Sequence, residues 1–221
     1  NFAKAGIRNI EEAFASDGAL VKTLEKLQRS GIPYPLSINV TKMDIILHEA
    51  AHWVWAAGGD FVSADRKQVV FTQPAAMEGF KNYFGLRRFI SPEFLNTGPA
   101  SGTAFVTRKT AIQMAGQWQG IVDALQHPQL KDELGIAAPP KTTYVGGASF
   151  VIWRYSRHAA EAFELVRFLS SQPTRIPASP HSDELPTRCE ALNMPSLENN
   201  IFHRTCLQTL QTGRIFPTMR L

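Results

Sequence analysis

Cysteine is scarce in this sequence, as are long apolar runs and blocks of like charge. Its two cysteines, Cys189 and Cys206, form neither a disulfide framework nor a CxxC zinc spacing, and the sequence does not decide whether they pair. The longest apolar stretches, such as 148–153, are far shorter than the roughly 20 residues of a membrane-spanning helix. The 23 Lys and Arg residues are interspersed with 19 Asp and Glu, whereas a nucleic-acid-binding surface needs clustered cations. A membrane span and a nucleic-acid partner are therefore not expected.

Linkers, internal repeats and targeting signals are also missing. No stretch rich in Gly and Ser or in charge divides the chain, and residues 1–7 lack the charged and apolar regions of a signal peptide. The composition, 44% hydrophobic and 19% charged, is that of a globular protein with a substantial core. We therefore expect one folded domain, or one domain with an appendage.

Helical and strand patterns alternate along the chain, which predicts an α/β fold with helices packed on a sheet. Ser16 is the expected N-cap of the first clear helix, and Gly58-Gly59 should end the second because glycine tolerates positive φ. Pro92 and Pro99 bracket a predicted loop. The predicted helices cover 17–29, 44–57, about 72–84, 118–125, 156–169 and a final one within 195–211. The predicted strands cover 34–40, 68–71, 110–115 and, as the clearest, 144–153.

The sharpest short motif is HExxH, formed by His48, Glu49 and His52. On a helix, this spacing places two imidazoles on one face, where they can ligate zinc beside a glutamate that acts as general base. The extended form of the motif would need Gly and His where the chain has Trp55 and Gly58. The third ligand could then be a downstream glutamate such as Glu78, although Asn82 stands where the usual orienting aspartate would be. The alternative is an amphipathic helix with Trp53 and its apolar neighbours buried and the motif on a polar arc.

Two other segments combine aromatic or glycine residues with polar ones. Gly116-Gln117-Trp118 places an indole at a predicted strand-to-helix junction, where the ring can stack on the apolar face of a sugar. The segment 144–149 offers backbone amides at Gly146 and Gly147 and a hydroxyl at Ser149. Each feature alone is also explained by a structural role, in the core or in a turn.

Taken together and in order, seven segments resemble the family 1 extracellular solute-binding proteins, the sugar-binding receptors of ABC importers. The segments are residues 2–7, 24–35, 53–62, 69–75, 105–118, 144–169 and 185–188. They include an F-x-K-A-G-I start, the Gly-Gly turn at 58–59 and an L-P-T-R element. The sequence departs from the family at Arg108, where Gly is usual, and at Ala148, where many members carry an aromatic residue.

The resemblance implies the fold and the domain organisation. Residues 1–221 correspond to the C-terminal lobe of a two-lobed solute-binding protein with a type II periplasmic-binding-protein-like fold, its helices packed on a mixed sheet. Segments at about 110–125 and 185–221 are those that contact the N-terminal lobe in the family. The exposed hinge-side surface is expected to drive dimerisation or pairing with a separate N-terminal lobe.

Specific ligand-binding residues follow from the same resemblance. Trp118 matches the sugar-stacking tryptophan, and Gly146, Gly147 and Ser149 match the start of the strand that faces the cleft. Asp44 and His48 lie at the beginning of a helix whose first residues often contact the ligand. Trp53 and Trp55 are expected in the core.

The function implied is binding of a carbohydrate, in the periplasm or outside the cell in association with the cell envelope, and its delivery to an ABC-transporter permease. No catalysis, metal or cofactor is expected. Two alternatives stay open: a zinc metallopeptidase that uses His48, Glu49 and His52, and a ligand-sensing lobe of a signalling protein.

Overall fold

The computed structural model describes residues 1–41, 43–95, 100–147, 149–171, 185 and 199–217. The first element is a short helix, α1 (Ile10–Ala13), and it precedes α2 (Asp17–Arg29). Helix α2 has the predicted bounds: the Ser16 side chain accepts a hydrogen bond from the Ala19 N–H at 3.1 Å, and Gly31 follows the helix with φ +99°. Both ends are therefore determined by local signals that the sequence displays.

The sheet of the described residues has two very short parallel strands, β1 (Leu36–Ser37) and β2 (Ile112–Gln113). Leu36 pairs with Ile112, and Ser37 pairs with Gln113. Both strands fall inside predicted ones, but the structure has much less strand than the sequence suggested. Around β1 lie α3 (Met43–Ala56), α4 (Pro74–Gly85), η1 (Leu86–Phe89) and α5 (Ala100–Val106). Helix α5 was not predicted.

The main core lies between α2, β1, α3 and α4. Its largest fully buried side chains include Leu24, Leu36, Trp53 and Phe89. Trp53 and Trp55 are only 1% and 5% exposed, which confirms that both belong to the core. The two long helices of this layer run against one another closely enough for Gly79 of α4 to touch the backbone of α3.

The second half of the described chain contains α6 (Gln117–Gln126), η2 (Pro128–Glu133), α7 (Ala159–Ser171) and α10 (Ile201–Leu210). Helix α6 packs on α10, where Gly120 lies against the ring of Phe202. None of the helices in the described part of the chain is long and apolar enough to cross a membrane.

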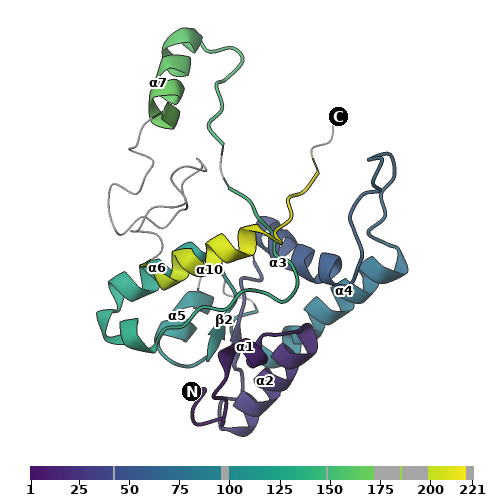
Figure 1. Cartoon of the computed structure of the whole chain (residues 1–221), viewed down its shortest axis with the longest axis vertical. Helices are drawn as coiled ribbons and strands as arrows, with labels where there is room; N and C mark the ends of the chain where they lie inside the picture. The colour runs from purple at the N-terminus through teal and green to yellow at the C-terminus, as the bar shows by residue number, and fades with distance from the viewer. Residues whose placement is uncertain (42, 96–99, 148, 172–184, 186–198, 218–221) are drawn as a thin grey trace.

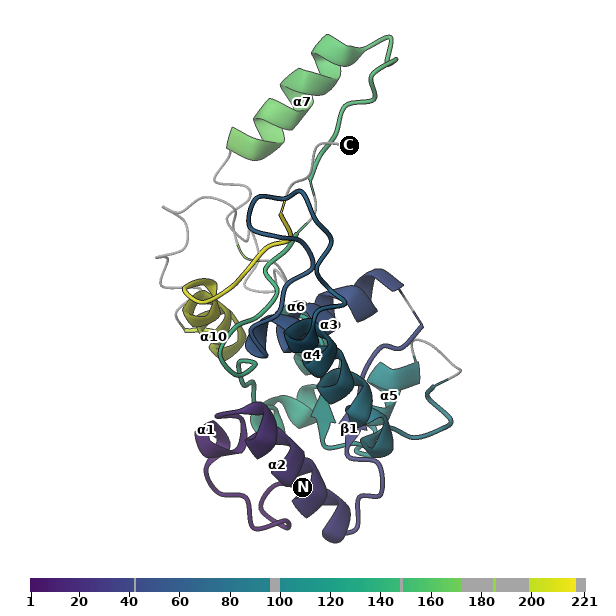
Figure 2. The ribbon, with the colours of Figure 1, turned by 90° about the vertical axis from the view of Figure 1, so that its right-hand side faces the viewer.

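Residues 146–147 and 149–171, which we call the arm, project away from the rest of the molecule (Figures 1 and 2). The arm consists of an extended segment followed by α7, and two of its side chains, Val151 and Trp153, are 86% and 70% exposed. The predicted strand at 144–153 is wrong for the residues that the structure describes: only Tyr144 forms a bridge, to Arg214. The reason is that a strand exists only through a partner's hydrogen bonds, and the described chain offers a partner at the first residue alone.

Two chain segments meet where the arm leaves the body. Residues 142–145 run parallel to residues 212–216, and we call these two segments the base of the arm. The Arg214 N–H donates to the Thr143 carbonyl at 2.9 Å, and the Val145 N–H donates to the Arg214 carbonyl at 2.8 Å. The Thr142 hydroxyl adds a bond to the Thr212 carbonyl at 2.8 Å.

Candidate functional site

Helix α3 carries two of the predicted ligand residues in its first turns. Asp44 is its second residue, and His48 follows one turn later. The half-buried His48 ring stacks on Tyr144 with centroids 4.1 Å apart and planes 9° apart. The structure therefore joins α3 to the segment that contains Gly146 and Gly147.

The stacked pair belongs to a larger aromatic cluster that sequence reasoning missed. Phe216 lies with its centroid 5.4 Å from Tyr144, 5.4 Å from Trp55 and 5.1 Å from Phe61. Phe216 comes from the C-terminal segment, far from the other rings in sequence. No periodicity or motif marked it, since only the pairing at the base of the arm brings it to α3.

The predicted glycine and serine contacts lie directly beyond this cluster. Gly146 and Gly147 are both exposed, and so is Ser149. A Cβ on Gly146 would collide with the Tyr144 hydroxyl, so glycine is needed there for the phenol to lie across the backbone. The phenol in turn orients the backbone that was predicted to face a ligand.

Trp118 lies at the second position of α6, and its side chain is 43% exposed. Its indole lies over Gly116, where a Cβ would be 2.5 Å from Nε1. The ring is thus held at a helix N-terminus with part of its surface open to solvent, which suits stacking.

The structure does not bring all the predicted residues into one contact group. Within the described residues, no hydrogen bond or ring contact joins Trp118 to His48 or Tyr144. Helix α10 links the two parts: Phe202 packs on Gly120 of α6, and Gly213, after the helix, touches the Val145 side chain.

The family is shown by a sequence comparison. The profile of the bacterial extracellular solute-binding proteins matches residues 14–175, which is more than half of the chain. The chain belongs to this family. A search of the curated proteins finds no match for this solute-binding protein.

Solved structures agree on the fold. An ABC-transporter solute-binding protein from Thermotoga lettingae, bound with α-D-tagatose, has a TM-score of 0.77 and 19% identity; the match covers 96% of this chain and 56% of that one. The GacH receptor of Streptomyces glaucescens, solved alone and with acarbose, has a TM-score of 0.75 and 19% identity, with 98% and 56% covered. A putative oligosaccharide periplasmic-binding protein from Synechococcus has a TM-score of 0.70 and 18% identity, with 97% and 58% covered.

These comparisons confirm the periplasmic-binding-protein fold. This solute-binding protein spans less than three fifths of the length of the solved structures that it matches. Arg108, where the family usually has Gly, adopts φ +62° in the structure. Glycine takes that conformation without strain, which explains the family's preference, and here Arg108 forms an ion pair with Glu133 at 2.7 Å.

The HExxH motif does not assemble a metal site in the described part of the chain. No group of three or more His, Cys, Asp or Glu side chains converges there. The prediction of a polar arc is also wrong, because His52 is only 4% exposed and the Oε1 atom of Glu49 is shielded from solvent. Instead, Tyr83 donates to Glu49 at 2.9 Å, and the Nδ1 atom of His52 lies 2.5 Å from the Thr142 carbonyl oxygen.

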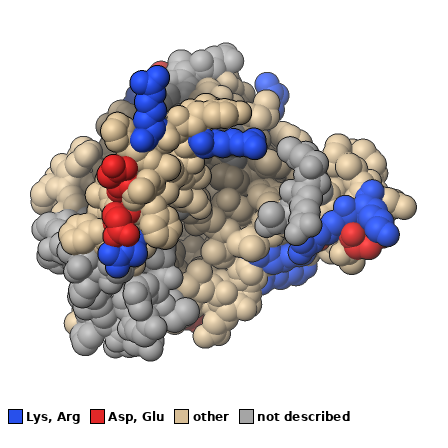
Figure 3. Space-filling model, turned by 90° about the horizontal axis from the view of Figure 1, so that it is seen from above, with Lys and Arg blue, Asp and Glu red and all other residues tan. Residues whose placement is uncertain are grey.

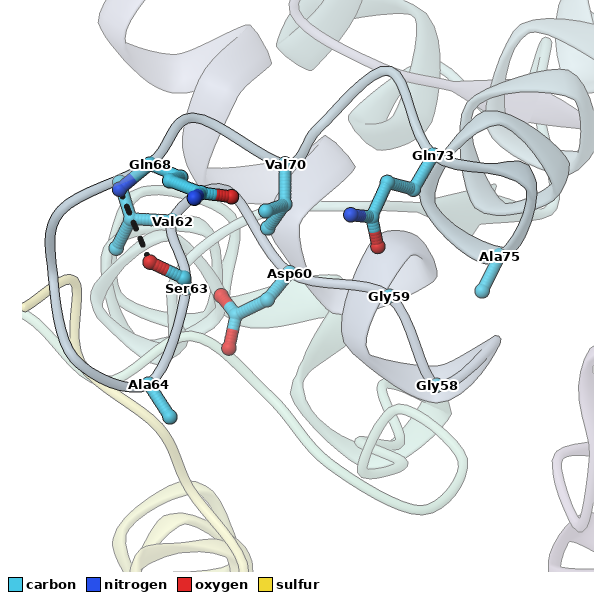
Figure 4. A pocket seen from close by; sticks show the side chains of 10 residues that line it. All are labelled: Gly58, Gly59, Asp60, Val62, Ser63, Ala64, Gln68, Val70, Gln73 and Ala75. Atoms are coloured by element: carbon cyan, nitrogen blue, oxygen red, sulfur yellow. Dashed lines mark hydrogen bonds between the residues drawn. The ribbon is translucent and has the colours of Figure 1, made fainter.

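A pocket of about 360 Å³ lies between the turn that follows α3 and the start of α4 (Figure 4). Asp60 and Gln73 point toward it, and the nearby loop is closed by a hydrogen bond from the Gln68 N–H to the Ser63 hydroxyl at 3.0 Å. None of the predicted ligand residues lines this pocket.

Asp60, beside this pocket, uses its carboxylate to accept hydrogen bonds from neighbouring residues. Partial burial alone would raise the pKa of Asp60. Hydrogen bonds from the Phe61 N–H, the Trp55 indole and Arg214 outweigh that effect and keep the pKa below its usual range. Since the carboxylate is bound by its neighbours, we assign Asp60 a structural role.

The face from which the arm projects is hollowed in the middle (Figure 3). The residues visible inside the hollow are neither acidic nor basic, and charged side chains of both signs, mostly Lys and Arg, lie toward its rim. Such a surface suits a neutral, polar solute better than a highly charged one.

Proposed function

We propose that this solute-binding protein binds a carbohydrate and delivers it to an ABC-transporter permease from the periplasm or the cell exterior. The family supports solute binding, and the three solved proteins are one bound with tagatose, one solved with acarbose and one described as a putative oligosaccharide-binding protein. The observation that carries the carbohydrate assignment is Trp118, an indole with much of its surface open, held at a helix N-terminus over Gly116. An amphipathic ring in this position is suited to the apolar face of a sugar.

The proposed roles of the other residues are those that the resemblance to the family implies, and the Asp44 side chain lies outside the part of the chain that the structure describes. Ser149 and Asp44 hydrogen-bond sugar hydroxyls, and Gly146 and Gly147 present backbone amides. His48 borders the same region, where its stacking on Tyr144 fixes its ring plane. The hollow on the face from which the arm projects shows no charged residue in its middle, which supports a neutral ligand.

A tryptophan comparison tests this proposal. We expect Trp118→Ala to weaken saccharide binding by about two- to twelvefold, as an aromatic stacking contact is worth about 0.5–1.5 kcal/mol. The matched control is Trp153→Ala, which removes another exposed indole outside the proposed site. Saturation-transfer NMR with a panel of mono- and oligosaccharides, amino acids and peptides measures both variants against the unchanged chain. One lobe alone is expected to bind weakly at most, which this method can detect. Equal signals for Trp118→Ala and the unchanged chain would rule out stacking, and signals from amino acids or peptides but from no saccharide would overturn the carbohydrate assignment.

We also propose that residues 1–221 act as a C-terminal lobe whose partner is an N-terminal lobe. The solved structures match 96–98% of this chain, so the match includes the arm, and more than two fifths of each solved chain lies outside it. The arm exposes a set of large apolar side chains that folded proteins normally cover. These are Phe150, Val151, Trp153, Tyr155, Phe163, Leu165 and Phe168. Segments 110–125 and 185–221 are proposed to contribute to the same contact.

An isolated chain should reveal this surface by associating with itself. We expect size-exclusion chromatography with light scattering to show dimers or larger species whose fraction grows with concentration. Val151→Lys should reduce that fraction strongly, because a charge in an apolar contact must be desolvated. Val69→Lys is the control, since Val69 is 63% exposed on the body of the protein. A monomer at all concentrations would contradict the proposed surface.

A further inference from the structure

The side chains of the HExxH motif point to different elements of the fold. Glu49 receives a hydrogen bond from Tyr83 of α4, whereas His48 and His52 both contact the base of the arm. Neither the family nor the proposed ligand site accounts for the two histidines together. Their contacts give them a role that requires no metal.

His52 makes the more deeply buried of the two contacts. Its Nδ1 atom lies 2.5 Å from the Thr142 carbonyl oxygen, which accepts and cannot donate, so the proton of this bond must be on Nδ1. The Nε2 atom lies 3.7 Å from Asp17 Oδ1, and the ring meets Trp53 edge-on at 5.5 Å. The imidazole therefore lies between Asp17 of α2 and its neighbours on α3, with no hydrogen-bond partner for Nε2 among the described residues, and it presents one donor to the chain segment that leads to the arm.

Two further contacts extend this attachment along the same segment. Lys141 donates to the Ala56 carbonyl near the end of α3 at 2.9 Å, and Tyr144 stacks on His48 one helical turn before His52. Helix α3 thus holds residues 141, 142 and 144 in succession. The second segment of the base is held through the first, by the bonds that Thr143 and Val145 exchange with Arg214.

We propose that His52, with His48, clamps the base of the arm to α3, and that His52 is a positioning residue for the segment that follows. The clamp sets the direction in which both base segments leave the body. It also places Gly146, Gly147 and Ser149, a consequence that rests on the proposed ligand site. The attachment to the base is independent of any ligand.

Hydrogen exchange tests the clamp in the full 221-residue chain without ligand. The Val145 and Arg214 amides report directly on the pairing at the base, because each donates one of its hydrogen bonds. His52→Phe keeps a ring but removes the donor, and we expect both amides to exchange at least about tenfold faster. His52→Asn retains a donor near the position of Nδ1 and should restore most of the protection. The control is His158→Asn, which replaces an exposed histidine of the arm and should leave the exchange of both amides unchanged.

Two outcomes would overturn the proposal. One is unchanged exchange of the Val145 and Arg214 amides in His52→Phe, with the variant folded. The other is equally fast exchange in His52→Phe and His52→Asn together with faster exchange throughout α2 and α4, which would show a packing role alone. Nitrogen-15 NMR of the unchanged chain adds an independent check, because the clamp requires a proton on Nδ1 of His52. A failed sugar titration would leave these readouts unaffected, so the two proposals can fail separately.

Discussion

The free energy of unfolding of this solute-binding protein should fall as the pH rises from about 4.5 to about 8. Burial raises the pKa of Glu49 from 4.5 to about 8, although the hydrogen bond from Tyr83 acts in the opposite direction. Between these pH values the folded chain keeps a proton that the unfolded chain releases. The stabilisation by the protonated Glu49 is complete below pH 4.5 and is lost as the pH rises through the pKa of the folded state. The free energy of unfolding falls by about 1.4 kcal/mol per pH unit, and by up to about 5 kcal/mol in total.

Glu49→Gln isolates this contribution from other titrating groups. The amide is nearly isosteric and does not ionise, so the difference in unfolding free energy between Glu49→Gln and the unchanged chain should grow with pH. Urea unfolding at pH 5, 6, 7 and 8 measures that difference. Glu78→Gln serves as control, because Glu78 is exposed and forms an ion pair with Lys81 on the surface of α4. A constant difference between Glu49→Gln and the unchanged chain would show that Glu49 is ionised throughout.

Tyr83→Phe tests the same pair from the other side. The Tyr83 hydroxyl lowers the pKa of Glu49, so its removal should move the upper limit of the pH-dependent interval above 8. The phenol itself titrates at unusually high pH, because it is buried and faces the Glu49 carboxylate. If the upper end of this pH interval moved below 8 in Tyr83→Phe, that result would contradict the hydrogen bond from Tyr83 to Glu49.

Gly79→Ala should be among the most destabilising single substitutions in the described part of the chain. A Cβ at Gly79 would lie 2.5 Å from the Trp53 carbonyl oxygen and from the Val54 Cα. Both atoms belong to the backbone of α3, so no side chain can rotate away, and α3 and α4 must separate around the buried Trp53. We expect a loss of about 3 kcal/mol or more in the free energy of unfolding.

Gly85→Ala is the matched control in the same helix. Gly85 is the last residue of α4, has helical dihedral angles of −62° and −21°, and leaves open space for a Cβ. Alanine there should therefore be neutral or stabilising by about 0.5 kcal/mol. Thermal and urea unfolding of both variants give the comparison. Similar stabilities for Gly79→Ala and Gly85→Ala would show that the two helices are not in backbone contact.

Helices were predicted well from the sequence because their signals are local. The periodicity of α2, its N-cap at Ser16 and the glycine after its end lie within 16 consecutive residues. Strands were predicted less well, since β propensity does not identify the partner strand. Residues 144–153 have the expected β-rich sequence, yet within the described residues only Tyr144 has a pairing partner.

The candidate site shows the same division. The exposed indole of Trp118 and the exposed Gly146 and Gly147 were anticipated from the resemblance to the family, and their roles as ligand contacts stay predictions. Phe216 was not anticipated, because its neighbours Tyr144 and Trp55 are distant in sequence. The L-P-T-R element, except Leu185, and Cys189 lie outside the described residues.

The sequence by itself determined the family, the positions of most helices and the placement of the HExxH motif on α3. Only the tertiary structure decided what that motif does. A helix turns every side chain toward some neighbour, and spacing alone cannot tell whether the neighbour is solvent, a metal or another segment. Packing of α4 against α3 placed the Tyr83 hydroxyl at Glu49, and packing of the base of the arm placed the Thr142 carbonyl at His52. Both motif side chains therefore have structural roles.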